Sequence, residues 1–175
     1  MARLEQLTAL LGGPPERRPS ADDWAEVEKY VGCSLPRDYK AFMDAYGTGE
    51  ISEELVVFHP RGSTPLLERM RETNEMFDEW REQSRDVFEE EYPYPFHPAP
   101  GGLISWGYDH SGNEYFFLPC DPNPDRWKVV TMVHEIGCET FDGPFTDFVL
   151  EFIERLQVID RNGVISPAVP SFKSF

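Results

Sequence analysis

Three residues with obvious chemical potential follow one another in this chain: Asp109, His110 and Ser111. They are the three residue types of a serine hydrolase, in which histidine takes the proton of serine and the acid orients the histidine. Adjacent residues of a turn point in different directions, however, and such triads are assembled from distant segments. The sequence also lacks the Gly-x-Ser-x-Gly motif that presents the serine in many hydrolases. We therefore interpret the segment as a turn.

Motifs for metal binding are incomplete. Asp121, Asn123 and Asp125 match the start of a calcium loop, but that loop needs glycine at position six and glutamate at position twelve. Arg126 and Met132 occupy those two positions. The histidines and cysteines show no spacing typical of zinc sites; they are His59, His97, His110, His134, Cys33, Cys120 and Cys138. We expect no metal site, no cofactor and no catalytic residues.

Carboxylates beside the turn leave one enzymatic hypothesis open. Asp109 and Glu114 could serve a hydrolase, because two carboxylates across a cleft can act as acid and base. This hypothesis requires a deep pocket that holds at least one carboxylate with a strongly raised pKa. The same pocket could instead belong to a small-ligand-binding domain.

Trp80 lies in a strongly acidic part of the chain. Residues 50–91 contain 13 acidic and 5 basic residues, which is half of the net charge of −16. The helical phase of Trp80 favours a position in the core. The alternative is an aromatic anchor surrounded by Glu79 and Glu82, a composition that suits a basic protein partner.

Composition limits the classes of function. The chain has 32 acidic and 16 basic residues, so phosphate backbones would be repelled and nucleic-acid binding is not expected. The charge favours a basic protein partner or a solvated acidic surface. Three cysteines do not form a secreted disulfide framework, and no segment approaches the ~20 apolar residues of a membrane span. We expect a cytoplasmic protein with no membrane attachment.

Apolar residues at helical spacing predict the elements that position these side chains. The expected helices are a short one ending at Gly12 and Gly13, one capped by Ser20 and ending at Gly32, and one with Pro36 in its first turn and Gly47 as its cap. A long helix is expected from Thr64 to about Glu89. The segment from Phe141 to Leu156 is expected to form the last helix, with Asp142 or Gly143 as its cap and Pro144 in its first turn. Residues 47–49 are interpreted as a cap followed by a turn.

Strand signals are strongest between residues 103 and 118. Two apolar strands, 103–106 and 115–118, flank a turn whose residues tolerate positive φ or bond their own backbone: Asp109, Ser111, Gly112 and Asn113. Further strands are expected at 55–58 and 128–133, and the last residues form an extended tail or an added strand. The order of elements predicts an α+β domain, with helices packed around a mainly antiparallel, or mixed, sheet.

Three segments carry a family resemblance. The first comprises Trp24-x-x-Val27-Glu28-x-x-x-Gly32, Leu35-Pro36-x-Asp38-Tyr39-Lys40-x-Phe42 and Tyr46-Gly47-x-Gly49. The second is Leu103-Ile104-Ser105-Trp106-Gly107-x-Asp109-x-x-Gly112-Asn113, and the third is Phe148-Val149-x-x-Phe152-Ile153. Together they resemble the SUKH superfamily, which includes fungal cell-wall assembly regulators of the Smi/Knr type and many bacterial immunity proteins.

The resemblance implies an α+β fold without catalytic residues that acts by binding another protein. It divides the chain into an N-terminal helix and linker (1–19), a SUKH-like domain (20–156) and a C-terminal extension (157–175). We therefore expect a non-enzymatic immunity protein that neutralises a toxin, for example a basic nuclease, by direct binding. A regulatory scaffold role, as in the fungal members, is an alternative beside the hydrolase and ligand-binding hypotheses. The expected partner-binding residues are Glu79, Trp80, Glu82, Tyr108, Asp109, Asn113 and Glu114.

Overall fold

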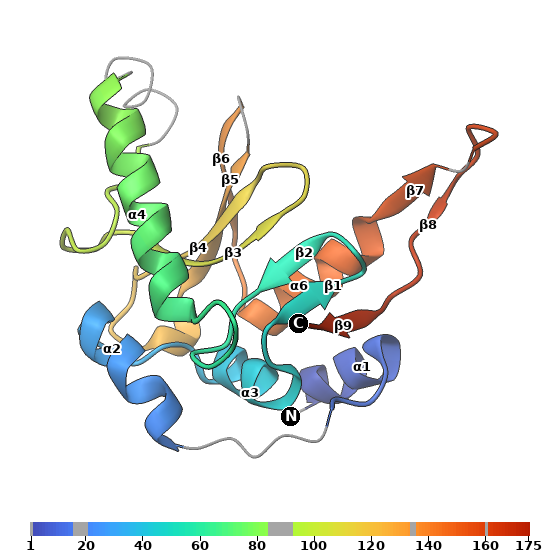
Figure 1. Ribbon diagram of the computed structural model, residues 1–175, viewed down its shortest axis with the longest axis horizontal. Helices are drawn as coiled ribbons and strands as arrows, with labels where there is room; N and C mark the ends of the chain where they lie inside the picture. Colours follow the sequence, from blue (N-terminus) through green and yellow to red (C-terminus); the bar gives the residue numbers. More distant parts are fainter. Residues whose placement is uncertain (1, 16–20, 84–92, 134–135, 160) are drawn as a thin grey trace.

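A computed structural model describes residues 2–15, 21–83, 93–133, 136–159 and 161–175 (Figure 1). Within these ranges one seven-stranded sheet has the order β6-β5-β4-β3-β2-β1-β9, and every neighbouring pair in it is antiparallel. Its strands are β1 (Gly49–Ile51), β2 (Leu55–Val57), β3 (Ile104–Asp109), β4 (Glu114–Leu118), β5 (Lys128–Val133), β6 (Gly137–Phe141) and β9 (Phe172–Ser174). The predicted α+β fold with a mainly antiparallel sheet is confirmed.

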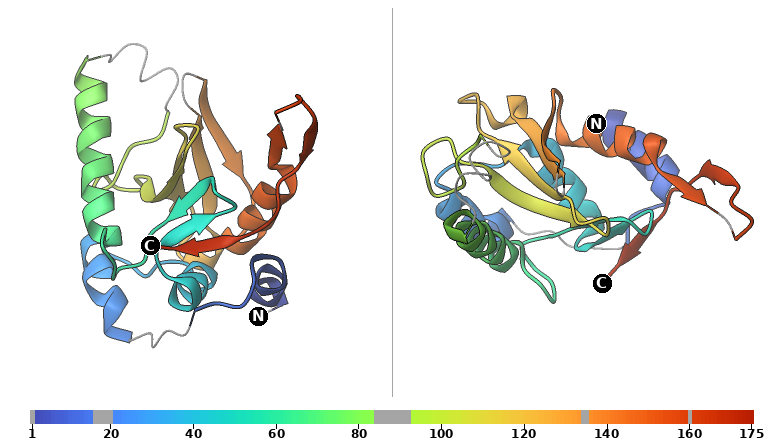
Figure 2. Two further views of the ribbon diagram at one scale, coloured as in Figure 1. Left: turned by 45° about the vertical axis from the view of Figure 1, so that its right-hand side comes forward. Right: turned by 90° about the horizontal axis from the view of Figure 1, so that it is seen from above.

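Helices cover both faces of the sheet (Figures 1 and 2). One face is packed against α3 (Arg37–Tyr46) and α6 (Phe145–Arg155), and α1 (Ala2–Leu11) packs against both of these helices. The other face is packed against α4 (Leu66–Gln83), whose start is contacted by α2 (Ala25–Val31). The part of the expected long helix beyond Gln83, and the expected cap Ser20, lie outside the described residues.

Aromatic rings build the core between the sheet and α3 and α6. Tyr39 is fully buried, and its ring centroid lies 5.1 Å from that of Phe117 and 5.0 Å from that of Phe145. Trp106 contacts the same Phe145 edge-on at 5.1 Å. The Tyr39 hydroxyl donates to the Phe58 carbonyl at 3.1 Å, which satisfies the one polar atom that this ring brings into the core.

The N-terminus of α6 is held by a residue of α3. The Asp38 carboxylate accepts hydrogen bonds from the backbone N–H of Thr146 at 2.8 Å and from its hydroxyl at 3.1 Å. An anion at this end of a helix satisfies a free N–H and complements the helix dipole. The Asp of the Leu-Pro-x-Asp-Tyr segment therefore fixes the start of α6, and with it the position of the groove described below.

A second, smaller core lies between the sheet and α4. Phe77 of α4 stacks on Phe96 with 4.7 Å between ring centroids and meets Phe116 of β4 edge-on at 5.6 Å. Leu103, Val130 and Met132 complete the buried part of this cluster. Aromatic pairs of this geometry stabilise the packing beyond the area that they bury, so Phe77 anchors the second half of α4, while Leu66 and Met70 bury its first half in the main core.

Several expected boundaries were wrong. Residues 47–49 were expected to be a cap and a turn, but Gly49 begins β1, and the sequence did not predict β6 at all. Asp109 is the last residue of β3, paired with Leu55, rather than part of the turn. Helix α6 begins at Phe145 with Pro144 as its N-cap, so neither Asp142 nor Gly143 is the cap and Pro144 precedes the first turn. Short strands with few apolar residues were missed because their partners in the sheet, rather than their own pattern, define them.

The C-terminal residues form two different structures. β9 pairs with β1 at the edge of the main sheet, so the expected added strand is present. Before it, β7 (Gln157–Ile159) and β8 (Ile165–Pro167) form a separate two-stranded hairpin, which projects away from the sheet (Figures 1 and 2). We call this hairpin the arm. None of the described helices is long and apolar enough to cross a bilayer.

Candidate functional site

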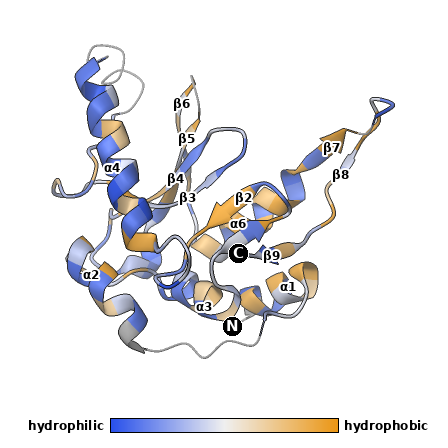
Figure 3. Cartoon of the chain, viewed as in Figure 1, coloured by the Kyte–Doolittle hydropathy of each residue, from blue (hydrophilic) through white to orange (hydrophobic). Residues whose placement is uncertain are grey.

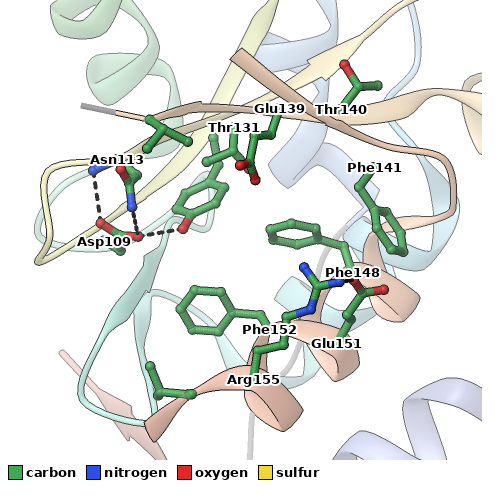
Figure 4. Close-up of a pocket in the computed structure, with 13 residues that line it drawn as sticks. Asp109, Asn113, Thr131, Glu139, Thr140, Phe141, Phe148, Glu151, Phe152 and Arg155 are labelled. Atoms are coloured by element: carbon green, nitrogen blue, oxygen red, sulfur yellow. Dashed lines mark hydrogen bonds and ion pairs between the residues drawn. The ribbon is translucent and has the colours of Figure 1, made fainter. Parts of the chain in front are cut away.

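A groove of about 450 Å³ lies between α6 and the strands β3 to β6 (Figure 4). It is lined by Asp109, Asn113, Tyr115, Thr131, Val133, Glu139, Thr140, Phe141, Phe148, Glu151, Phe152, Arg155 and Leu156. At the end of α6 that borders the groove, Phe152 and Leu156 are only half-buried. Its volume is in the range of small-molecule pockets, although its residues form an open trough.

Aromatic rings form the floor of this groove. The Phe148 ring centroid lies 5.5 Å from that of Tyr115 and 5.5 Å from that of Phe141. Phe152, one turn further along α6, lies 6.4 Å from Phe148 and 6.2 Å from Tyr115, and it is only half-buried. Such a surface favours the apolar side chains of another polypeptide.

Charged side chains border the floor. Glu139 is exposed on β6, and Glu151 forms an ion pair with Arg155 one turn later in α6. With Asp109, the lining contains three carboxylates and one guanidinium. The border is therefore net acidic, which favours a partner segment that is neutral or basic.

Asp109 is committed to holding the β3–β4 turn. Its carboxylate accepts from the backbone N–H groups of Ser111 at 3.0 Å and Asn113 at 2.9 Å, and from the Asn113 side-chain amide at 2.7 Å. The Tyr115 hydroxyl donates to it at 2.5 Å (Figure 4). Burial and this hydrogen bond to Asp109 raise the pKa of Tyr115, so the phenol stays a donor. These bonds give Asp109 and Asn113 a local structural role.

The neighbours of Asp109 do not assemble a triad. His110 Nε2 lies 2.5 Å from Glu50 on β1, and the Ser111 hydroxyl donates to Glu54 at 2.8 Å. Each side chain of the turn thus has its own partner on the β1–β2 hairpin or within its own turn. His110 and Ser111 therefore belong to a turn, as interpreted from the sequence, whereas Asp109 ends the strand before it.

Glu114 faces the opposite side of the sheet from Asp109. It forms an ion pair with Arg69 of α4, and the Arg69 guanidinium lies 4.9 Å from the centre of the Tyr108 ring. Burial raises the pKa of Glu114, against the opposing effect of Arg69. Glu114 does not line the groove. Asp109 and Glu114 therefore do not form the shared pocket that the hydrolase hypothesis requires.

The remaining candidates for metal binding or nucleophilic chemistry are equally dispersed. Among the described residues, no three histidines, cysteines or carboxylates are placed to hold a metal ion. Burial raises the pKa of Cys138 to about 11, and burial together with nearby Glu28 raises that of Cys33. Both thiols stay protonated near neutral pH, which is the unreactive form.

The chain matches the model of the SMI1 / KNR4 family (SUKH-1) over residues 18–151. It belongs to this family. The match covers most of the chain and includes the first two segments that carried the resemblance in the sequence, and it ends within the third. No curated protein matches the sequence.

A second candidate surface of this SUKH chain is the outer face of α4. Five glutamates with spacings of four, three, four and three residues point to solvent; they are Glu68, Glu72, Glu75, Glu79 and Glu82. This spacing keeps all five on one side of the helix. None of them forms an ion pair with a described residue. Figure 3 shows α4 as mostly hydrophilic along its length. We call this surface the acidic stripe.

Trp80 lies beside the acidic stripe. It is half-buried, with its ring centroid 5.8 Å from that of Phe77, so it belongs partly to the small core. Met76, one turn earlier, is 42% exposed. The predicted site residues thus fall in three places: Glu79, Trp80 and Glu82 on α4, Tyr108 and Glu114 at the Arg69 ion pair, and Asp109 and Asn113 at the groove.

Sequence reasoning missed the aromatic floor of the groove as a functional surface. Phe148 and Phe152 were expected in the buried stripe of the last helix. The groove was not predicted because the strand β6, which supplies Phe141 and Glu139 to its lining, was not predicted.

Proposed function

We propose that this SUKH-family chain is a non-enzymatic binding protein that neutralises a basic protein, such as a toxin encoded by an adjacent gene. The observation that carries this proposal is the acidic stripe. Five glutamates on one exposed helix face, without an ion pair to any described residue, form a concentrated negative surface on a molecule whose net charge is already −16. Such a surface attracts a basic protein and speeds its association.

The stripe is supported by a rigid base. Phe77 anchors the second half of α4 to the sheet, and the Arg69–Glu114 ion pair links its first half to β4. A surface that is already ordered loses little conformational entropy on binding. Met76 and Trp80 add apolar area next to Glu79. A core of apolar contact with charged surroundings is the usual composition of a protein interface.

A basic nuclease is a suitable target for this surface. A nuclease must present cations to hold phosphate backbones, and the same cations would face the acidic stripe. The strong negative charge of this chain would repel nucleic acid from a shared complex. Inhibition of the nuclease by binding alone would need no catalytic residues in this chain. This agrees with the separate partners of Asp109, His110, Ser111 and Glu114, which do not assemble a catalytic site.

Calorimetric titration against the purified product of the adjacent gene tests the proposal. We expect tight binding that the double variant Glu75→Lys/Glu79→Lys weakens by about 10-fold or more, mainly through slower association. The variant Glu5→Lys/Glu154→Lys makes the same change in net charge on exposed positions of α1 and α6, and it should bind nearly as wild type does. Equal losses for the two variants, or no binding by the wild type, would refute the assignment.

A further inference from the structure

The arm exposes large apolar side chains to solvent. Ile159 and Ile165 are cross-strand partners in β7 and β8, and they are 70% and 60% exposed. Val158, on the opposite face of β7, is 49% exposed. An isolated two-stranded hairpin has marginal stability in water, and a contiguous exposed apolar surface on a folded protein usually marks an interaction site. Figure 3 shows the hydrophobic character of β7.

The groove described above offers a surface of matching chemistry. Its floor is made of Phe141, Phe148, Phe152 and Tyr115, and its open form admits a chain segment. An aromatic floor packs well against β-branched side chains such as those of Ile159 and Ile165.

The arm does not occupy the groove of its own chain. Leu156 lines the groove and β7 begins at the next residue, so the arm starts at the border of the groove and leads away from it (Figures 1 and 2). The backbone N–H of Ala168 donates to the Leu156 carbonyl at 2.9 Å, which closes the base of the arm. Among the arm residues that the structure describes, none lines the groove.

Charge distinguishes the arm from the rest of the chain. The arm (residues 157–167) carries one acidic and one basic residue and is neutral, whereas residues 1–156 carry 31 acidic and 14 basic residues. The groove lining has three carboxylates against one guanidinium. As a neutral segment, the arm meets less repulsion in an acidic groove of a second copy than the strongly acidic remainder of the chain would.

We propose that two copies of this chain form a two-fold dimer, in which the arm of each copy lies in the groove of the other. A two-fold axis brings the same two surfaces together twice, so every arm and every groove is covered. The face of the arm that carries Ile159 and Ile165 contacts the aromatic floor, with Phe152 at its centre. This contact uses neither the acidic stripe nor a toxin, and it is independent of the function proposed above.

Sedimentation velocity of the full chain, from micromolar to submillimolar concentration, tests the dimer. We expect Ile159→Asp to weaken dimerisation roughly 100-fold or more, because each dimer loses the contact twice. Val158→Asp makes the same change on the opposite face of the same strand and should leave the dimer intact. Both positions are exposed, and circular dichroism should show an unchanged fold. A wild-type monomer at every concentration, or an Ile159→Asp protein that dimerises as wild type does, would overturn the proposal.

Salt and hydrogen exchange separate this contact from toxin binding. Two molecules of charge −16 repel each other, so dimerisation through apolar surfaces should strengthen as NaCl is raised. Binding of a basic protein to the acidic stripe should weaken under the same conditions. In hydrogen exchange, residues 157–167 and 139–156 should become protected as concentration rises. Protection that is absent from these segments in the dimer would contradict the arm-in-groove arrangement.

Discussion

The role of a single residue such as Asp109 depends on its hydrogen-bond partners, and the sequence alone does not identify those partners. Asp109 was predicted to contact a partner, yet its carboxylate accepts four hydrogen bonds from its own hairpin and is 4% exposed. The Asp-x-x-Gly-Asn turn was recognisable because its residue types suit a turn. The commitment of the carboxylate to Tyr115 depends on strand register, which residue types alone do not give.

Replacing Asp109 should therefore affect stability. We expect Asp109→Asn to lower the free energy of unfolding by about 2 kcal/mol, since hydrogen bonds to a charged acceptor are weakened and one acceptor oxygen becomes a donor. Asp78→Asn changes an exposed carboxylate in a surface ion pair with Arg81 and should cost less than about 0.5 kcal/mol. Urea denaturation measures both. Similar small losses would mean that the Asp109 network contributes little.

Glu114 should add a pH dependence to stability. Burial raises its pKa in the folded state, so the folded protein holds this proton at pH values where the unfolded chain has lost it. The resulting stabilisation is complete below the ordinary carboxyl pKa and is lost as pH rises through the raised pKa. The glutamine variant Glu114→Gln does not titrate, and its stability relative to wild type should increase over that interval. Denaturation curves from pH 4 to 8 that keep a constant difference would contradict this account.

Secondary-structure elements were predictable where one segment carries its own pattern. The helices α3 and α6 show apolar stripes over ten and eleven residues, and the structure buries them. The three-residue strands β1 and β9 have no room for a pattern, and Gly49 resembles part of a helix cap. A Cβ at Gly49 would lie 2.5 Å from the Lys173 carbonyl oxygen. The close approach of β9 therefore explains why glycine occupies this position.

The C-terminal strand should contribute measurably to the fold. The Phe172 ring lies 4.9 Å from that of Tyr46 and 6.2 Å from that of Phe42, so it extends the main core from β9. We expect Phe172→Ala to lower the free energy of unfolding by about 2–3 kcal/mol. Phe175→Ala, at a position that is 59% exposed, should change it by less than about 0.5 kcal/mol. Equal effects in thermal unfolding would show that β9 is not part of the stable core.

The molecule as a whole separates two kinds of surface. The acidic stripe of α4 lies on one side, and α6 and the arm lie on the other (Figures 1 and 3). The aromatic groove is on the side of α6. The sequence indicated the acidic side through its charge count, because half of the net charge lies in residues 50–91. It did not indicate the groove, because β6, which contributes to its lining, was not predicted. Salt should affect the two surfaces in opposite directions.

The claim that this chain acts by occupying a partner, without chemistry of its own, is tested most directly by stoichiometry. The activity of the toxin that we propose as the partner is titrated with the chain, at toxin concentrations well above the dissociation constant. The account predicts a linear loss of activity that is complete at one chain per toxin, with Glu75→Lys/Glu79→Lys requiring a large excess. Complete inactivation by a small fraction of an equivalent would reveal turnover, and full activity at saturating chain would reveal no neutralisation; either result would contradict the account.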